Sequence, residues 1–139
     1  MKKLFIFSGL FLATFIFFSA AQDKEGPVIR FDREVHEYGK ILVDTVPDGK
    51  IKFTVYNEGT QPLVLTNVRA CCGTRVNGYT EQPIAPSDSG YVEVEFRIVS
   101  RPHRIGRTVT VQSNAANRQT AILRITGEVV ESGEGIIDI

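Results

Sequence analysis

Cys71 and Cys72 are the residues whose types and spacing could do chemistry, because they are the two cysteines of the chain and are adjacent. Two neighbouring thiols can form a disulfide, belong to a metal site, act as a reactive pair or simply pack. Neighbouring Cα atoms are about 3.8 Å apart, whereas disulfides usually span about 4.4–6.8 Å. A bond between these cysteines would therefore be strained and easily reduced. We expect two unpaired or intermolecularly paired thiols, with a vicinal disulfide and a reactive role as open alternatives.

His36 and His103 would complete the ligand count of a zinc site, but the spacing argues against one. Structural zinc sites separate paired cysteines by two to four residues, so that both sulfurs reach one ion. Cys-Cys-Gly-Thr is also not the Cys-x-x-Cys of thioredoxin-type proteins, and no hydrolase, phosphate-loop or zinc-protease motif occurs. The sequence therefore predicts no metal, no cofactor and no catalytic residue. We expect His36 at a strand end and His103 in a loop.

The elements that must position these residues are strands, because the apolar residues recur every second position. Ile51, Phe53 and Val55 alternate with polar residues. The same period predicts further buried positions: Ile29, Phe31, Val92, Val94, Phe96, Ile98, Val109, Val111, Leu123, Ile125 and Val129. Turn-forming residues separate the runs. This pattern predicts an all-β protein, an antiparallel immunoglobulin-like β-sandwich of about seven to eight strands.

The strand that leads to the cysteines changes parity between Leu65 and Val68. A bulge near Thr66–Asn67 would let both apolar sets face the core. Adjacent strand residues point to opposite faces. We therefore expect Cys72 to point inward and Cys71 to point outward, so that the two thiols diverge.

The N-terminal sequence has the pattern of a secretory signal. Lys2 and Lys3 precede an apolar run from Leu4 to Phe18, and Ala21 ends a group of small residues. We predict that residues 1–21 are cleaved, with an uncleaved anchor as the alternative. The two-lysine start and short apolar run are typical of bacteria. Export to the periplasm, cell surface or medium is therefore the expected localisation, where disulfides can form.

The remaining 118 residues suit one domain with one core. We assign that domain to residues 22–130 and a C-terminal tail to residues 131–139, and we expect no transmembrane segment after cleavage. Loss of the two signal lysines leaves 14 basic against 16 acidic residues, without a basic stripe. Nucleic acid is therefore not an expected partner.

Several motifs in order resemble one known family. They are His36–Ile41, Phe53–Gly59, Pro62–Val68, Cys72–Gly73, Ile84–Gly90 and Val109–Asn114. Together they resemble the secreted bacterial family catalogued as domain of unknown function 1573, over about Phe31 to Val129. The resemblance implies an immunoglobulin-type sandwich related to Hydin-like and major-sperm-protein-like domains, and an envelope setting. It implies no activity, because the family has none assigned.

The cysteine stretch departs from that family. The family pattern reads Ser-Cys-Gly-Cys-Thr, where this chain reads Ala-Cys-Cys-Gly-Thr over residues 70–74. Aligned on Gly73, Cys72 takes the place of the family's first cysteine and Thr74 stands where the second should be. Any chemistry that needs cysteines on both sides of the glycine is in doubt here.

These observations favour a non-enzymatic β-sandwich module that binds an envelope protein or polymer, or is structural there. The expected binding loop is Gly73–Pro83, and a second exposed loop is expected around residue 102. The candidate binding residues are Arg75, Asn77, Tyr79, Gln82, Arg101, His103 and Arg104. The alternatives are a thiol-based redox or metal-handling protein that uses Cys71 and Cys72, and a glycan-binding module. We expect a monomer, with a dimer possible through Cys71.

Overall fold

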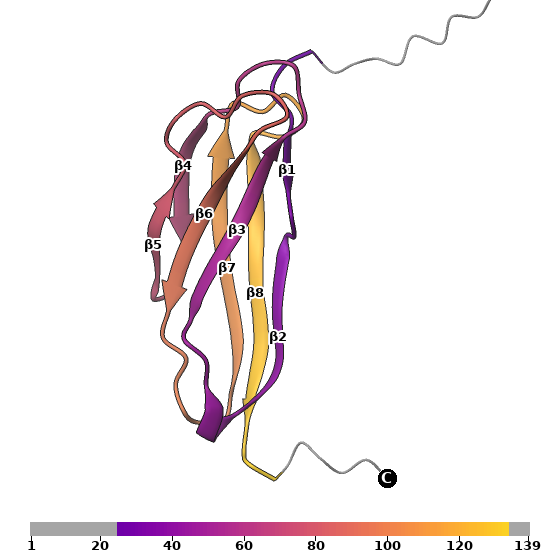
Figure 1. The fold of residues 1–139 in the computed structure, drawn as a ribbon. Helices are drawn as coiled ribbons and strands as arrows, with labels where there is room; N and C mark the ends of the chain where they lie inside the picture. The colour runs from indigo at the N-terminus through magenta and orange to yellow at the C-terminus, as the bar shows by residue number, and fades with distance from the viewer. Residues whose placement is uncertain (1–24, 134–139) are drawn as a thin grey trace, which may run out of the picture.

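Two four-stranded sheets packed face to face form the fold of residues 25–133, the residues that the computed structural model describes (Figure 1). The first sheet has the order β1 (Ile29–Phe31), β3 (Lys50–Asn57), β6 (Ser89–Phe96), β5 (Thr74–Tyr79). The second has the order β2 (Val35–Leu42), β8 (Thr120–Val130), β7 (His103–Ser113), β4 (Leu65–Ala70). A 3₁₀ turn, η1 (Val43–Thr45), lies between β2 and β3. The predicted all-β, immunoglobulin-like sandwich is confirmed, although β2 pairs with β8 in parallel.

The core lies between the two sheets and is formed by the alternating apolar residues. Every position that the two-residue period predicts to be buried is buried, and Phe53, Val55, Val92, Val94, Val109, Leu123 and Ile125 have no exposed surface. Sheets with one face on the core and one face in water produce this alternation. The polar residues between these positions therefore lie on the two outer faces.

The inner strand pairs are regular, whereas the edge strands are not. β3 and β6 pair without interruption, as do β7 and β8. Register shifts interrupt the pairing of all three longer edge strands, β2, β4 and β5, and the fourth edge strand, β1, has only three residues. The shift in β4 falls between Leu65 and Asn67, so the predicted bulge is confirmed. Bulges and short edges hinder edge-to-edge pairing with other chains.

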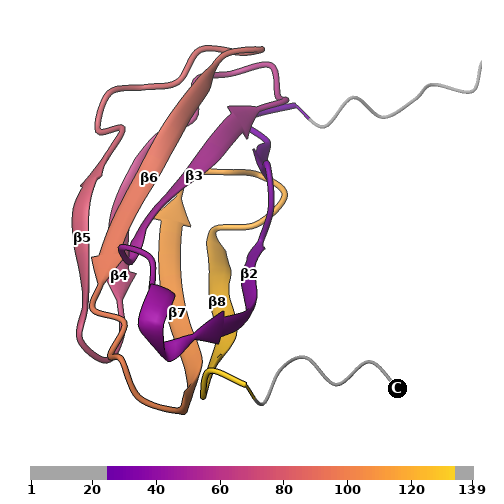
Figure 2. The same ribbon diagram turned by 60° about the horizontal axis from the view of Figure 1, so that its bottom comes forward.

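The chain crosses between the sheets on both sides of the sandwich (Figure 2). On one side β1 belongs to the first sheet and β2 to the second. On the other side β4 ends at Ala70 and β5 begins at Thr74 in the opposite sheet. Only Cys71–Gly73 lie between these strands, so the cysteines occupy one of the two shortest crossings, each of three residues.

The prediction of a loop over Gly73–Pro83 is wrong for Thr74–Tyr79, which form strand β5. Val76 is the only aliphatic side chain of β5, and Asn77-Gly78 resembles a turn, so an alternating pattern is not visible. The second expected loop is also shorter than predicted, because His103 and Arg104 begin β7. His36 is the second residue of β2, near the strand end where it was expected.

The predicted signal at residues 1–21 and residues 134–139 of the predicted tail lie outside the described residues. Glu131–Gly133, which the structure does describe, follow β8 as exposed residues. Within residues 25–133 there is no helix with the length and apolar character needed to span a bilayer.

Candidate functional site

One end of the sandwich, which we call the amide end, is held by the side-chain amides of Asn57 and Asn117. Asn57 is almost completely buried. Its Nδ2 donates to the carbonyls of Gln61 and Ile84, at 2.7 and 2.9 Å. Its Oδ1 accepts the backbone N–H of Gly59 at 2.9 Å and that of Val28 at 3.4 Å. One side chain thus satisfies four backbone groups, which is a structural role.

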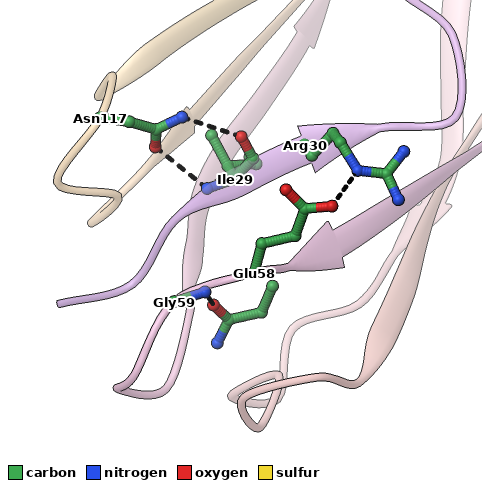
Figure 3. Close-up of polar contacts among 6 residues, drawn as sticks. Ile29, Arg30, Glu58, Gly59 and Asn117 are labelled. Atoms are coloured by element: carbon green, nitrogen blue, oxygen red, sulfur yellow. Dashed lines mark hydrogen bonds and ion pairs between the residues drawn. The ribbon is translucent and has the colours of Figure 1, made fainter. Parts of the chain in front are cut away.

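Asn117 closes the outer edge of β1 (Figure 3). Its Oδ1 accepts the N–H of Ile29 at 3.0 Å, and its Nδ2 donates to the carbonyl of Ile29 at 2.9 Å. The amide therefore takes the place of a neighbouring strand at this residue. Beside it, Arg30 pairs with Glu58 (Figure 3). Sequence reasoning missed both asparagines, because asparagine between strands is equally typical of an exposed turn.

The opposite end contains the cysteines, in a tight turn from Cys71 to Thr74. The N–H of Thr74 donates to the carbonyl of Cys71 at 3.1 Å. Cys72 and Gly73 have φ of +51° and +73°. Two successive positive φ values are typical of a type I′ turn. Cys72 therefore has a left-handed conformation that non-glycine residues rarely adopt.

Cys71 takes part in the ladder between β4 and β7 through its sulfur. Its N–H donates to the carbonyl of Thr108 at 3.1 Å. The carbonyl of Cys71 accepts from Thr74, and the N–H of Thr108 donates instead to Cys71 Sγ, at 3.4 Å. Hydrogen bonding by the Thr108 side chain, then by its backbone and by Cys72, lowers the pKa of the Cys71 thiol. The same contact with Cys71 raises the pKa of the Cys72 thiol.

Arg107 links this turn to the interior of the sandwich. Its guanidinium donates to the carbonyl of Cys72, and its Cζ lies 5.4 Å from the centre of the Phe96 ring. A guanidinium over an aromatic face gains cation–π energy. We use the name cysteine corner for Cys71–Arg75 together with Phe96 and Arg107. The side-chain oxygen of Thr74 is buried there without a hydrogen-bond partner among the described residues.

The prediction that Cys72 points into the core is wrong. Cys72 is exposed and Cys71 is half-buried, and both thiols are free. β4 ends at Ala70, so strand parity no longer decides where the next side chains point. The turn brings the two thiols close enough to shift each other's pKa, whereas we expected them to diverge.

A hollow of about 480 Å³ opens beside the cysteine corner. Its lining includes Gly73 and Phe96 and four charged residues, Asp48, Arg75, Glu95 and Arg97. The hollow is an open surface feature and not an enclosed cavity. Both signs of charge meet in it, together with the exposed side chain of Pro47, whereas Phe96 is buried.

Two of the predicted binding residues meet at Glu95. Nδ2 of Asn77 lies 3.1 Å from the Glu95 carboxylate, and a guanidinium nitrogen of Arg75 lies 3.3 Å from it. Hydrogen bonds from Asn77 and then from Arg75 lower the pKa of Glu95. Arg75 and Asn77 project from strand β5 and not from a loop.

The other predicted residues do not join this group. Tyr79 is half-buried and packs against the core, and Gln82 is exposed beyond β5. Arg104 lines a separate hollow of about 440 Å³ with Glu37, Lys40 and Glu128.

The two histidines are engaged elsewhere. Nδ1 of His103 lies 2.6 Å from the carbonyl of Arg101, and Nδ1 of His36 accepts from Arg33 at 3.2 Å. Burial, with the charge of Arg33, lowers the pKa of His36. Within residues 25–133, no three His, Cys, Asp or Glu side chains lie together as metal ligands would.

Comparisons with solved structures show the fold. A protein of unknown function from Porphyromonas gingivalis W83 is 14% identical with a TM-score of 0.59, over 80% of this chain and 50% of that protein. The secreted serine protease VesC from Vibrio cholerae is 16% identical with a TM-score of 0.54, over 76% of this chain and 23% of that protein. WR4, a C. elegans MSP family member, is 10% identical with a TM-score of 0.45, over 76% of this chain and 100% of that protein.

The chain spans about half the length of the Porphyromonas protein and about a quarter of VesC. No curated protein sequence matches the chain significantly. The model of one protein family matches residues 29–129, which include all eight strands except the last residue of β8. The predicted family resemblance is thereby confirmed, and the chain belongs to the family described as protein of unknown function (DUF1573).

Proposed function

We propose that this domain is a non-enzymatic, exported module of the bacterial cell envelope that binds a protein partner at the hollow beside the cysteine corner. One observation carries the proposal. This hollow combines Arg75, Arg97, Asp48 and Glu95 with the exposed apolar side chain of Pro47. Arginine is enriched at protein interfaces and among their energetically dominant residues, and these interfaces combine polar with apolar surface.

The edges of the sheets indicate how such a partner would bind. A protein can bind by adding a strand to an exposed sheet edge. Here register shifts interrupt β2, β4 and β5, and Asn117 closes the short edge of β1. These features oppose strand addition, so binding through side chains is favoured.

The proposal excludes a hydrolytic cysteine enzyme because the thiols lack an activating histidine. A cysteine nucleophile of the hydrolytic kind needs an imidazole within hydrogen-bond reach. In the structure Nδ1 of His103 contacts the Arg101 carbonyl, and Nδ1 of His36 accepts from Arg33. Neither ring has a hydrogen bond to Cys71 or Cys72 among the contacts of residues 25–133.

The aromatic side chains make glycan binding the weaker alternative. Sugar-binding sites use open aromatic faces, and the chain has no tryptophan. The guanidinium of Arg30 lies 4.3 Å from the centre of the Tyr56 ring, and the ammonium of Lys52 lies 5.0 Å from that of Tyr91. Cations thus cover faces on which a sugar would stack.

Site-specific crosslinking in the native cells tests this proposal. A photoreactive amino acid replaces Arg97 or Arg75 at the hollow, and Gln119, which is exposed at the amide end, serves as the control position. We expect the same discrete adduct from both hollow positions and none from Gln119. No adduct under several growth conditions, or equal adducts from Gln119, would contradict the proposal.

The same cells test export. We expect the mature chain to start at Gln22 and to fractionate with the envelope, because signal peptidase cuts after small residues such as Ala21. N-terminal sequencing of the purified chain measures this. A chain that retains Met1 and remains in the cytosol would refute export and leave the binding test unaffected.

A further inference from the structure

The cysteine corner places two chemically different thiols side by side. Cys71 Sγ accepts the N–H of Thr108 because the Cys71 carbonyl is already bonded to Thr74. Cys72 is exposed at the top of the turn, and its own carbonyl is held by Arg107. Both carbonyls are therefore hydrogen-bonded in the reduced turn.

We propose that Cys71 and Cys72 form a vicinal dithiol site that exchanges with low-molecular-weight disulfides, with Cys71 as the nucleophile and Cys72 as the resolving thiol. This site is separate from the proposed partner binding, because its substrate is a small molecule and neither Cys71 nor Cys72 lines the hollow.

The exchange has two steps. The Cys71 thiolate attacks one sulfur of the small disulfide R–S–S–R, forms Cys71–S–S–R and releases R–S⁻, which takes up a proton from water. Cys72 then loses its proton to solvent and attacks Cys71 Sγ, which releases the second R–S⁻ and closes the bond between the two cysteines. Two electrons pass from the dithiol to the small disulfide, which leaves as two thiols.

The surroundings decide which sulfur attacks first. A hydrogen-bond donor on a sulfur stabilises the thiolate, and Thr108 supplies such a donor to Cys71 alone. The pKa of Cys71 is lowered by its bonds to Thr108, and that of Cys72 is raised by its contact with Cys71. At any given pH the thiolate fraction is therefore larger for Cys71 than for Cys72, and the thiolate is the reactive form.

The product is suited to transfer and not to stabilising the fold. Adjacent Cα atoms are about 0.6 Å closer than the lower end of the usual disulfide range. A strained disulfide has a more oxidising potential and is returned to the dithiol by other thiols. Closing such a ring distorts the backbone, and Gly73, which follows directly with a φ of +73°, can adopt the altered conformation.

Stoichiometry and mass test the proposal on the full reduced chain. The probe is dithiobis(nitrobenzoate), an aromatic disulfide whose released thiolate is coloured, at one equivalent. We expect wild type to release two aryl thiolates per probe consumed and to lose two hydrogens in intact mass, without a retained aryl group. Cys72→Ser should release one aryl thiolate and keep one aryl group, at Cys71.

Rates identify the nucleophile. Cys72→Ser, which retains Cys71, should react several-fold faster at neutral pH than Cys71→Ser. Its rate should also rise with pH at a lower midpoint. Arg107→Gln should slow Cys71, and Arg107→Lys should restore part of the rate, because Arg107 also favours the charged form of Cys71. Circular dichroism confirms that each variant is folded.

Two outcomes would overturn the proposal. One is a wild-type chain that keeps an aryl group after one equivalent, since Cys72 would then not resolve the mixed disulfide. The other is a Cys71→Ser variant that reacts as fast as Cys72→Ser, since the Thr108 contact would then have no effect on reactivity. Either outcome would overturn the dithiol proposal whether or not an envelope partner is found.

Discussion

The amide end and the cysteine corner are both built from polar groups at the ends of strands, but they are organised in opposite ways. At the amide end, Asn57 makes four hydrogen bonds to backbone groups and Asn117 makes two. At the cysteine corner, Cys72 has a left-handed backbone, Thr74 has a buried oxygen without a partner among residues 25–133, and both thiols are free.

The difference indicates that the amide end stabilises the fold and that the cysteine corner lowers its stability. A fully satisfied network of buried polar groups stabilises one structure. Strained backbone and unused polar groups reduce stability and cluster at functional sites. The comparison therefore assigns a structural role to the amide end and supports the cysteine corner as the place for function. The predictions below test that assignment, from the largest expected effect to the smallest.

Asn57→Ala should have the largest effect. It leaves two carbonyls and two N–H groups without their partner in a buried site, so we expect a loss of about 4 kcal/mol in the free energy of unfolding. Urea denaturation measures it. The control is Asn77→Ala, an exposed amide near the cysteine corner, for which we expect a change within about 0.5 kcal/mol. Equal effects at the two asparagines would remove the contrast between the ends.

Asn117→Ala should cost about 1–2 kcal/mol, because it removes both hydrogen bonds to Ile29. The edge of β1 would then be open, so the amide of Ile29 should exchange with solvent faster than in wild type. Hydrogen exchange and urea denaturation together measure the two effects. Unchanged exchange at Ile29 would show that Asn117 does not close this edge in solution.

Arg107→Gln should cost about 1 kcal/mol. The change removes the cation–π contact with Phe96 and weakens the bond to the Cys72 carbonyl. A matched control is Arg104→Gln on the outer face of the same strand, where little change is expected. A larger loss than that of Asn57→Ala would mean that the cysteine corner, and not the amide end, carries the stability.

Cys72→Asn should have the smallest effect and the opposite sign. Asparagine tolerates the left-handed region better than cysteine, so we expect a gain of about 0.5 kcal/mol in the free energy of unfolding. Thermal denaturation under reducing conditions measures the shift. A loss of stability would show that the Cys72 side chain contributes packing that offsets its backbone strain.

The sandwich itself could be predicted from the sequence, because burial on one face produces a regular alternation. The strand at Lys50–Asn57 shows this clearly, and its inward residues Ile51, Phe53 and Val55 are all buried. The bulge in β4 was also predictable, since an odd step between Leu65 and Val68 requires an extra residue. Edge strand β5 was not, because its side chains are mostly half-exposed and carry little alternation.

For the candidate site too, part could be predicted from the sequence and part could not. The sequence alone identified the two cysteines, their strained adjacency and the residues Arg75 and Asn77. It could not show that the side chain of Asn57 is buried or that Arg107 reaches the Cys72 carbonyl, because Arg107 and Cys72 are 35 positions apart. The inward direction predicted for Cys72 failed where the strand ended one residue before Cys71.

By itself the sequence determined the fold class, the family and the core, because these depend on patterns repeated over many residues. The tertiary structure alone decided the state of the cysteine pair. Thr108 and Arg107 come from a strand that is distant in sequence, and only the pairing of β4 with β7 brings them to the turn. Hydrogen bonds and charges act over a few ångströms, so the chemistry of Cys71 and Cys72 depends on neighbours that folding supplies.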